Sequence, residues 1–338
     1  MLDSLLNRLP VEDAAAAALE FEPVPRMLGD HSLYRRMTLT PASCGHNSLF
    51  LAQVADWTWG TVSETCGTEM YREKNGNGMP TYLSFYYLRI LGGPAMQMHQ
   101  LTFGDVIDVV TTAYNFGSES ILTLHRVARA SPGGAPPRAV SAYELYERRD
   151  ESCLYVESLN RWITRSRPGN EALVKSSPAG IVTSHLPVLP ERHSPRLVYD
   201  VARRSGTFHD VASPEYEPVV DEYTVDYTID AARDLNGVGL VFFASFASIV
   251  DSSLLKLWKH LGRDVDSFVN RVVRDRQICY AANVEVDTPV RLTLRSWRRR
   301  DDPREEIFNI VMRDPARDRL VLVCTLNIRS EHSSHASA

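Results

Sequence analysis

The sequence predicts an α+β protein in which two antiparallel sheets each wrap around a central buried helix. Residues 44–59 begin with small polar side chains and then become almost uniformly apolar, which is typical of a helix buried on nearly every side. Residues 234–251 repeat this order, and strand-like segments follow both stretches. Placing residues 45–49 against residues 236–240 aligns the two expected helix starts without a gap, which indicates an internal duplication. Two such units form a double hot-dog fold; the alternative is two unrelated β-rich domains.

The expected division of the chain follows this repeat. We expect an N-terminal helix and connector over residues 1–28, a first hot-dog domain over 29–165, a linker over 166–220, a second hot-dog domain over 221–330 and a disordered tail over 331–338. The linker is distinguished by its Pro, Ser and Gly content. The strands are expected over residues 34–40, 81–90, 103–114, 119–130, 139–147 and 153–162 in the first domain, and over 222–230, 278–286, 290–297, 307–313 and 320–329 in the second.

Composition excludes several classes of function. The 338 residues are 44% hydrophobic and 23% charged, and the net charge of -5 gives no indication of a nucleic-acid partner. No apolar run reaches the length of a membrane span, and the N-terminus lacks the pattern of a signal peptide, so we expect a cytoplasmic protein without a membrane partner. The five cysteines are scattered without a CxxC pair, which argues against a metal site and against a disulfide framework.

The two expected helix starts are the first candidates for a site. A helix N-terminus presents free N–H groups and a positive dipole end, which suit an oxyanion or a phosphate. His46 could act as acid, base or hydrogen-bond donor, and Asn47 or Ser48 could cap the helix or contact a ligand. Asn236 and Gly237 hold the corresponding place in the second half, where glycine permits close approach of backbone to a ligand. A capping histidine and a plain strand-to-helix turn are the structural alternatives.

A tyrosine-rich strand supplies the second group of candidates. Alternation along residues 81–90 puts Tyr82, Ser84 and Tyr86 on one face, and residues 83, 85 and 87 on the other, core-facing side. A tyrosine hydroxyl in a dry channel can donate to an enolate or, with a base nearby, act as a nucleophile. We therefore expect Tyr82 to be catalytic and Ser84 to contact substrate, whereas an ordinary structural role is favoured for Tyr86 and Tyr87.

Four motifs resemble one known family. They are Gly45-His-Asn-Ser-Leu-Phe50, Pro80-Thr-Tyr-Leu-Ser-Phe-Tyr-Tyr87, Phe103-Gly-Asp105 and Leu235-Asn-Gly-Val-Gly-Leu-Val-Phe-Phe-Ala-Ser245. Together they resemble the leinamycin-pathway bifunctional acyltransferase/decarboxylase family of polyketide biosynthesis. The resemblance implies a double hot-dog enzyme that decarboxylates methylmalonyl-CoA and delivers propionyl to an acyl carrier protein, without a cofactor other than the CoA thioester substrate. It also implies an active-site tyrosine, for which Tyr82 is the best match.

These observations combine into one hypothesis with three rivals. Loss of CO2 from a malonyl or methylmalonyl thioester would leave an enolate held by N–H groups near Gly237 or His46, by the Tyr82 hydroxyl and by the Asn236 amide. A thioesterase would instead use a carboxylate such as Asp234 to activate water, although Asp234 is better explained as an anchor of its turn. A dehydratase would pair His46 with Asp234, and a non-catalytic scaffold would only bind the carrier protein. Arg298–Arg300 could dock that acidic partner or form a solvated face, and both a monomer and a homodimer remain open.

Overall fold

A computed structural model describes residues 24–43, 48–131 and 137–330 of the chain. The expected N-terminal helix and C-terminal tail lie outside these residues. The strands are β1 (Arg26–Met27), β2 (Ser32–Thr38), β3 (Tyr82–Leu91), β4 (Val106–Asn115), β5 (Ser120–Arg129), β6 (Leu154–Arg165), β7 (Leu173–Lys175), β8 (Tyr216–Thr228), β9 (Val272–Tyr280), β10 (Pro289–Arg299), β11 (Glu305–Asp314) and β12 (Arg319–Arg329). The helices are α2 (Ser48–Cys66), α3 (Ala142–Tyr146), α4 (Pro195–Ser205), α5 (Phe243–His260) and α6 (Val265–Val269), with 3-10 turns η2 (Met98–Gln100) and η3 (Glu191–His193).

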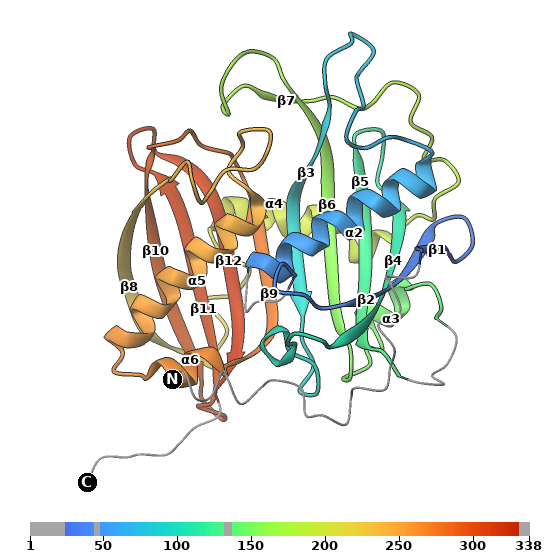
Figure 1. Ribbon diagram of the computed structural model, residues 1–338. Helices are drawn as coiled ribbons and strands as arrows, with labels where there is room; N and C mark the ends of the chain where they lie inside the picture. The colour runs from blue at the N-terminus through green and yellow to red at the C-terminus, as the bar shows by residue number, and fades with distance from the viewer. Residues whose placement is uncertain (1–23, 44–47, 132–136, 331–338) are drawn as a thin grey trace.

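All the strands belong to one 12-stranded sheet (Figure 1). Its order is β1-β2-β4-β5-β6-β3-β9-β12-β11-β10-β8, with β7 added to β6, and every ladder in it is antiparallel. The two halves of the chain therefore share one sheet, because β3 of the first half pairs with β9 of the second, and the prediction of two separate sheets is wrong. Both halves also share one element order, in which a strand and a long helix precede four antiparallel strands.

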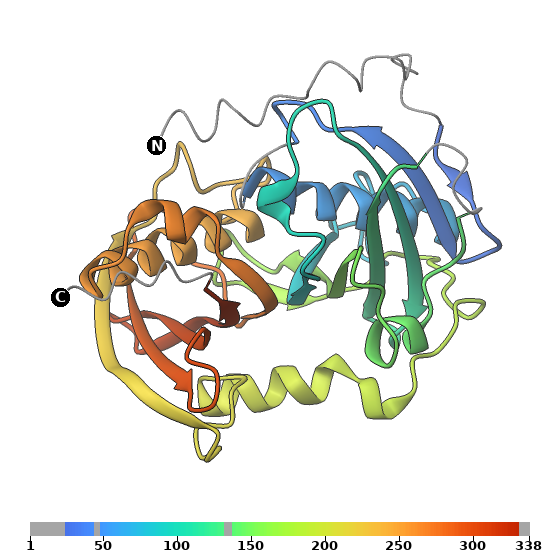
Figure 2. The same ribbon diagram turned by 90° about the horizontal axis from the view of Figure 1, so that it is seen from below.

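The long helices α2 and α5 lie on the same face of this sheet and contact each other (Figure 2). Their inward side chains belong to one continuous apolar core. The members contributed by the two helices include Phe50, Leu51, Val54, Trp57, Phe246, Val250, Leu254 and Leu257. The opposite side of each helix is polar and exposed, as at Asp56 and Glu64 of α2 and at Ser252 and Lys256 of α5. The prediction that the helices are buried on nearly every side is therefore wrong.

The two helices do not begin at aligned positions. Aligning residue 45 with residue 236 puts Ser48 against Gly239, yet α5 begins at Phe243, four residues later. The intervening residues form a tight turn closed by an antiparallel bridge between Leu235 and Val241. The gapless alignment of helix starts predicted from the sequence is therefore wrong, since Asn236 and Gly237 precede α5 rather than cap it.

A bulge in β3 separates the two halves of the sheet at one end. The pairing of β3 with β9 runs from Leu91–Asp275 to Tyr87–Cys279 and stops there. The register of β3 against β6 shifts between Phe85 and Tyr87, so the first residues of β3 stay with β6 and leave β9. The bulge also puts Phe85 in the core beneath the helices and Tyr87 in a second core on the opposite face. The predicted sharing of one face by residues 85 and 87 is wrong for this reason.

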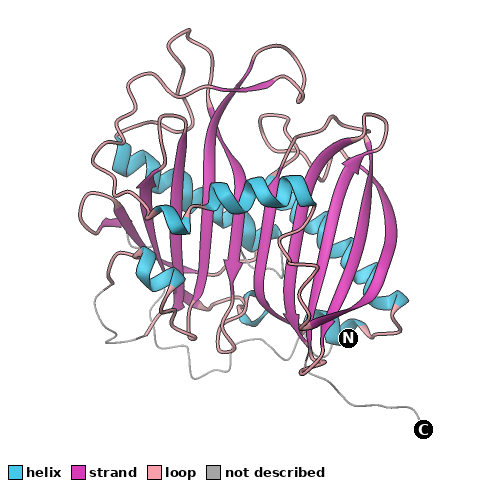
Figure 3. Ribbon diagram, turned by 180° about the vertical axis from the view of Figure 1, so that it is seen from behind, coloured by secondary structure: helices cyan, strands magenta, loops and turns pink. Residues whose placement is uncertain are grey.

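The segment expected to be a linker carries structure of its own. β7 extends β6, and α4 crosses the face of the sheet opposite to α2 and α5 (Figure 3). Tyr199 and Ala202 of α4 pack in the second core with Tyr87 and Cys279. The strand expected from residue 222 begins at Tyr216, inside the predicted linker. The Pro-rich segment thus covers an apolar face that the sheet would otherwise expose.

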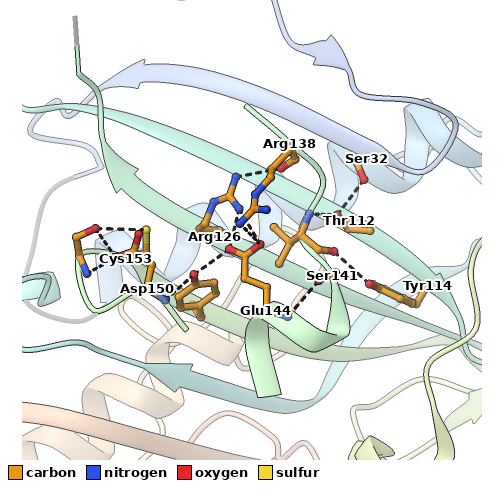
Figure 4. A network of polar contacts seen from close by, with 12 residues as sticks. Ser32, Thr112, Tyr114, Arg126, Arg138, Ser141, Glu144, Asp150 and Cys153 are labelled. Atoms are coloured by element: carbon orange, nitrogen blue, oxygen red, sulfur yellow. Dashed lines mark hydrogen bonds and ion pairs between the residues drawn. The ribbon is translucent and has the colours of Figure 1, made fainter. Parts of the chain in front are cut away.

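Residues 139–147, expected to be a strand, contain the short helix α3 instead. Ser141 caps this helix by accepting a hydrogen bond from the Glu144 N–H. The Glu144 carboxylate accepts bonds from Arg126 at 2.7 and 2.9 Å and from the Tyr155 hydroxyl at 2.9 Å, which ties α3 to β5 and β6 (Figure 4). The strand prediction is wrong because the backbone of residues 142–146 forms a capped helix, and side-chain hydrogen bonds hold this helix against the sheet.

Candidate functional site

Tyr82 and Asn236 meet where β3 leaves β9. The Asn236 Nδ2 atom donates a hydrogen bond to the Tyr82 hydroxyl at 3.2 Å. The Asn236 Oδ1 atom accepts from the N–H groups of Val238 at 3.1 Å and Leu240 at 3.0 Å. These two bonds fix which end of the amide faces Tyr82. The Tyr82 oxygen is therefore an acceptor toward Asn236, and its own proton is free for another partner.

A cavity of about 200 Å³ lies at this fork between the halves. Its lining residues come from β3, from β6 and the segment after it, from the turn before α5 and the first turn of α5, from the end of β9 and the residues after it, and from the start of β12. They are Tyr82, Ser84, Phe85, Tyr86, Ile163, Asn170, Glu171, Leu173, Asn236, Leu240, Val241, Phe243, Phe246, Tyr280, Ala281, Ala282, Asn283 and Arg319. The structure thus brings together three of the residues proposed from the sequence, namely Tyr82, Ser84 and Asn236.

Aromatic contacts hold Tyr82 in place. Its ring meets the Trp59 ring of α2 edge to face, with centroids 4.9 Å apart. The Trp59 indole N–H donates to the Leu83 carbonyl at 3.1 Å, so α2 is bonded to β3 at the same point. Phe85 and Phe243, which also line the cavity, stack with centroids 3.9 Å apart. Both halves therefore position the cavity wall through packed rings.

Burial keeps the Tyr82 phenol protonated. Desolvation raises its pKa to about 12, and the hydrogen bond from Asn236 opposes that rise only in part. At neutral pH the hydroxyl is a neutral hydrogen-bond donor, and its ionisation as a nucleophile would require a strong base. A donor aimed at developing negative charge is the role that this environment favours.

Two residues from the end of β6 and the following segment hold the turn that carries Asn236. Arg165 donates to the Val238 carbonyl at 2.8 Å and to the Asn170 Oδ1 atom at 2.8 Å. Asn170, which is buried, donates from Nδ2 to the Gly239 carbonyl at 2.9 Å and to the Val284 carbonyl at 3.0 Å. The first half of the chain thereby fixes the position of an amide in the second half.

The cavity also contains an ion pair that sequence reasoning missed. The Glu171 carboxylate lies 3.4 Å from the Arg319 guanidinium in the cavity wall and 3.2 Å from Arg317. Arg319 also donates to the Asn283 carbonyl at 3.0 Å. Glu171 and Asn170 fall in the Pro-rich segment expected to be a linker, where no periodic pattern singles out a polar residue. Only their place next to β6 could have brought them into consideration.

The other predicted site residues lie elsewhere. His46 and Asn47 fall outside the described residues. Ser48 begins α2, and a rise of 1.5 Å per residue places it about 17 Å along the axis from Trp59. The Tyr82 contact is thus with the interior of α2 and not with its start. Gly237 is exposed in the turn beside Asn236.

Asp234 anchors its turn, as expected. Its buried carboxylate accepts from the Tyr227 hydroxyl and from the Asp230 N–H, each at 2.8 Å. It is not among the residues that line the cavity.

The arginine run expected to form either a docking surface or a solvated face is occupied by ion pairs. Arg298 pairs with Glu306, Arg299 with Asp301 and Glu305, and Arg300 with Glu217. Within residues 24–43, 48–131 and 137–330, no group of His, Cys, Asp and Glu side chains could hold a metal ion. No helix in the same part of the chain is long and apolar enough to cross a membrane.

Comparison with solved structures identifies the fold. An oleoyl thioesterase of Lactobacillus plantarum superposes with a TM-score of 0.56 at 12% identity, over 90% of this chain and 99% of that one. The 12:0-ACP thioesterase of Umbellularia californica gives 0.53 at 10% identity, over 89% and 94% of the two chains. An acyl-ACP thioesterase of Bacteroides thetaiotaomicron gives 0.50 at 10% identity, over 88% and 98%. At these identities the likeness establishes a shared fold and no more.

The sequence itself defines the family. The profile of the LnmK N-terminal Hot Dog Fold domain matches residues 34–210, which is more than half of the chain. The protein therefore belongs to this family and has a hot-dog fold, and the resemblance to the leinamycin-pathway family is confirmed. No curated protein sequence matches the chain.

Proposed function

We propose that this protein is an acyl-thioester enzyme of polyketide biosynthesis built from two hot-dog units. It decarboxylates a malonyl or methylmalonyl thioester and transfers the resulting acyl group to an acyl carrier protein, with no cofactor beyond the CoA thioester substrate. The observation that carries the proposal is the Tyr82–Asn236 pair facing a small cavity between the two halves. Membership in the LnmK family and the thioesterase structures that share the fold support thioester chemistry.

The size of the cavity favours a short acyl group. A cavity of 150 Å³ accommodates benzene, so about 200 Å³ corresponds to roughly eight heavy atoms. A methylmalonyl group has about seven heavy atoms, whereas the oleoyl and 12:0 chains named for the similar structures are much longer. The cavity itself therefore fits a malonyl-type group, while an adjoining hollow of about 700 Å³, also lined by Tyr82, has room for the longer remainder of a thioester substrate.

The chemistry follows from the surroundings of Tyr82. The bond between the carboxylate and the α-carbon breaks, CO2 leaves, and the electron pair moves to the thioester carbonyl to form an enolate. The neutral Tyr82 hydroxyl, oriented by Asn236, donates to the enolate oxygen. Phe85, Ile163 and Phe243 provide an apolar wall, beside which a charged carboxylate is less favourable than neutral CO2. Protonation at the α-carbon then completes the acyl group.

Transfer requires a second displacement at the same carbonyl. The thiol of the carrier protein's arm attacks the carbonyl carbon, and the thiolate of CoA leaves and takes a proton. The tetrahedral intermediate carries its charge on the oxygen that already faces Tyr82, so one donor serves both steps.

Hydrolysis by a thioesterase is the second candidate, because Glu171 places a carboxylate in the cavity. Such an enzyme would use Glu171 as the base that activates water. The ion pairs of Glu171 with Arg317 and Arg319 favour a structural role for this carboxylate instead. Asp234 is a weaker base candidate than Glu171, because its carboxylate is already occupied by Tyr227 and Asp230.

Liquid chromatography with mass spectrometry of the small-molecule products distinguishes the two. Incubation with malonyl-CoA and with methylmalonyl-CoA should yield CO2 with acetyl-CoA and propionyl-CoA, and Glu171→Gln should retain this activity. Release of free malonate or methylmalonate that is abolished in Glu171→Gln would show instead that the protein is a thioesterase.

A further inference from the structure

A charge cluster buried between α5 and the sheet contains more positive than negative charge. Arg276 of β9 and Arg271, just before that strand, are 1% and 8% exposed. Arg276 donates to the Asp251 carboxylate of α5 at 2.6 and 3.2 Å, and Arg271 donates to it at 3.2 Å. Asp251 is itself buried. Two guanidinium groups therefore share one carboxylate, which leaves an excess of one positive charge in the interior.

No second carboxylate balances this charge. In the described part of the chain, Asp251 is the one carboxylate within 4.0 Å of Arg271 or Arg276. Two acidic residues at the start of β11 are held by other arginines, Glu305 by Arg274 and Arg299, and Glu306 by Arg263 and Arg298. A buried charge without a partner is strongly unfavourable. The cluster therefore lacks one negative charge.

The thiol of Cys324 does not supply the missing charge. Cys324 lies on β12 beside Arg276, but burial raises the pKa of its thiol to about 11, and Arg276 opposes that rise only in part. The thiol is therefore neutral at pH 7. Both guanidinium groups keep their charge at this pH, because arginine does not lose its proton in proteins under these conditions.

A small pocket adjoins both arginines. Its volume is about 20 Å³, and Arg271 and Arg276 line it together with apolar side chains such as Ile90 and Leu154. None of the described residues that line it is a carboxylate. Ile90 of β3 pairs with Arg276 of β9, so the pocket lies toward the end of this ladder that is opposite to the fork at Tyr82.

The two arginines keep N–H groups that no described side chain or carbonyl accepts. Each guanidinium has five N–H donors. Arg271 uses one on the Phe268 carbonyl at 2.6 Å and one on Asp251, and the Nε atoms of Arg271 and Arg276 are both buried without a partner among the described residues. The Gln97 amide in the pocket wall is no substitute acceptor, because its oxygen already accepts from the Val273 N–H at 3.1 Å.

We propose that this pocket binds one monovalent anion of the size of chloride. The anion accepts hydrogen bonds from Arg271 and Arg276 and, with Asp251, balances their charge. Because the walls come from β3, η2 and β6 as well as from the start of β9, the ion joins the two halves of the chain. The assignment is independent of the proposed function, since neither arginine lines the cavity at Tyr82.

Size and charge together select this class of ligand. A void of about 10–15 Å³ holds one water molecule, so about 20 Å³ has room for a single monatomic ion and not for a phosphate ester. A water molecule also fits, but it supplies no charge. A single negative charge matches the excess of one positive charge.

The dependence of stability on chloride tests the site in solution. The full chain is unfolded in urea at pH 7 and constant ionic strength, with sodium chloride replacing sodium gluconate, whose anion is too large for the pocket. Once the site is saturated, each tenfold increase in chloride should raise the folding equilibrium constant about tenfold, because the ion binds only the folded chain. Arg271→Met removes the excess charge and should abolish this dependence. Arg274→Met is the matched control, because Arg274 does not line the pocket, and it should keep the dependence.

Crystals of the wild-type protein grown in sodium bromide give a second readout that needs no variant. An anomalous bromide peak is expected between Arg271 and Arg276. Absence of this peak at saturating bromide would overturn the proposal, and so would identical unfolding curves in chloride and gluconate. Equal chloride dependence in wild type and Arg271→Met would also overturn it, because the stabilisation would then be a general effect of the salt.

Discussion

Replacing Tyr82 by phenylalanine removes one oxygen and leaves the ring that packs on Trp59. The variant should fold, since it loses a single hydrogen bond from Asn236, which costs about 0.5–1.5 kcal/mol. Catalysis should suffer far more. Loss of one preorganised donor to an oxyanion costs about 100- to 1,000-fold in kcat, or roughly 2.7–4 kcal/mol.

The assay is single-turnover decarboxylation of malonyl-CoA and methylmalonyl-CoA, with CO2 and acyl-CoA followed by mass spectrometry. The control is Tyr223→Phe, because Tyr223 lies on β8 and does not line the cavity. Asn236→Ala tests the residue that donates a hydrogen bond to the Tyr82 hydroxyl. Because Asn236 acts through Tyr82, the double variant should be little worse than Tyr82→Phe alone. Wild-type turnover by a folded Tyr82→Phe protein would refute the assignment of this hydroxyl as the oxyanion donor.

Four further predictions concern the pH dependence, the stability of the fold and the positioning of Asn236. Since the pKa of Tyr82 is about 12 in the folded protein instead of 10, its contribution to the free energy of unfolding should be complete below pH 10 and lost as the pH rises from 10 to 12. A tyrosine that titrates near pH 12 in the ultraviolet spectrum, and is absent from Tyr82→Phe, checks this. Burial, with a smaller effect of Arg35, lowers the pKa of His125 to about 3, so the free energy of unfolding should fall as pH drops from about 6.5 to 3, and less steeply in His125→Gln; equal slopes in denaturant titrations would contradict this. Phe243→Ala, which removes the stack on Phe85, should destabilise the protein by about 3–5 kcal/mol in urea unfolding. Asn170→Ala should lower kcat more than it raises KM, because it releases the turn that orients Asn236; a change in KM alone would show that Asn170 contacts substrate instead.

The sequence was sufficient to predict the elements that depend on strong periodicity. The alternating residues of β10 specify a strand on their own, and the apolar residues of α2 indicate a helix with a buried side. The order of elements in the two halves followed from comparing the halves with each other. These are features that local pattern and internal repetition determine.

The remaining features depend on long-range contacts that no local pattern contains. The bulge between Phe85 and Tyr87 arises where β3 changes partners, and strict alternation therefore assigned residue 87 to the wrong face. The short helix within residues 139–147 is the exception, because Ser141-Ala-Tyr-Glu144 is a local helix-start pattern that the strand prediction overlooked. Asn170 is a functional candidate only because the chain after β6 returns to the turn at residue 239.

The same limit explains the helix starts. Small polar residues before an apolar run suit both a helix cap and a tight turn. At Asn236 the side chain closes a turn, and α5 begins only at Phe243. The sequence could indicate that Asn236 lies beside the helix, but not that a turn would direct its amide at Tyr82.

The central claim is that one site both removes CO2 and transfers the acyl group. Intact-mass analysis of a phosphopantetheinylated acyl carrier protein, incubated with the protein and methylmalonyl-CoA, tests it most directly. The account predicts a carrier protein heavier by a propionyl group, and no such product with Tyr82→Phe. A methylmalonyl adduct that keeps its carboxylate, or an unmodified carrier protein beside free acid, would contradict the account.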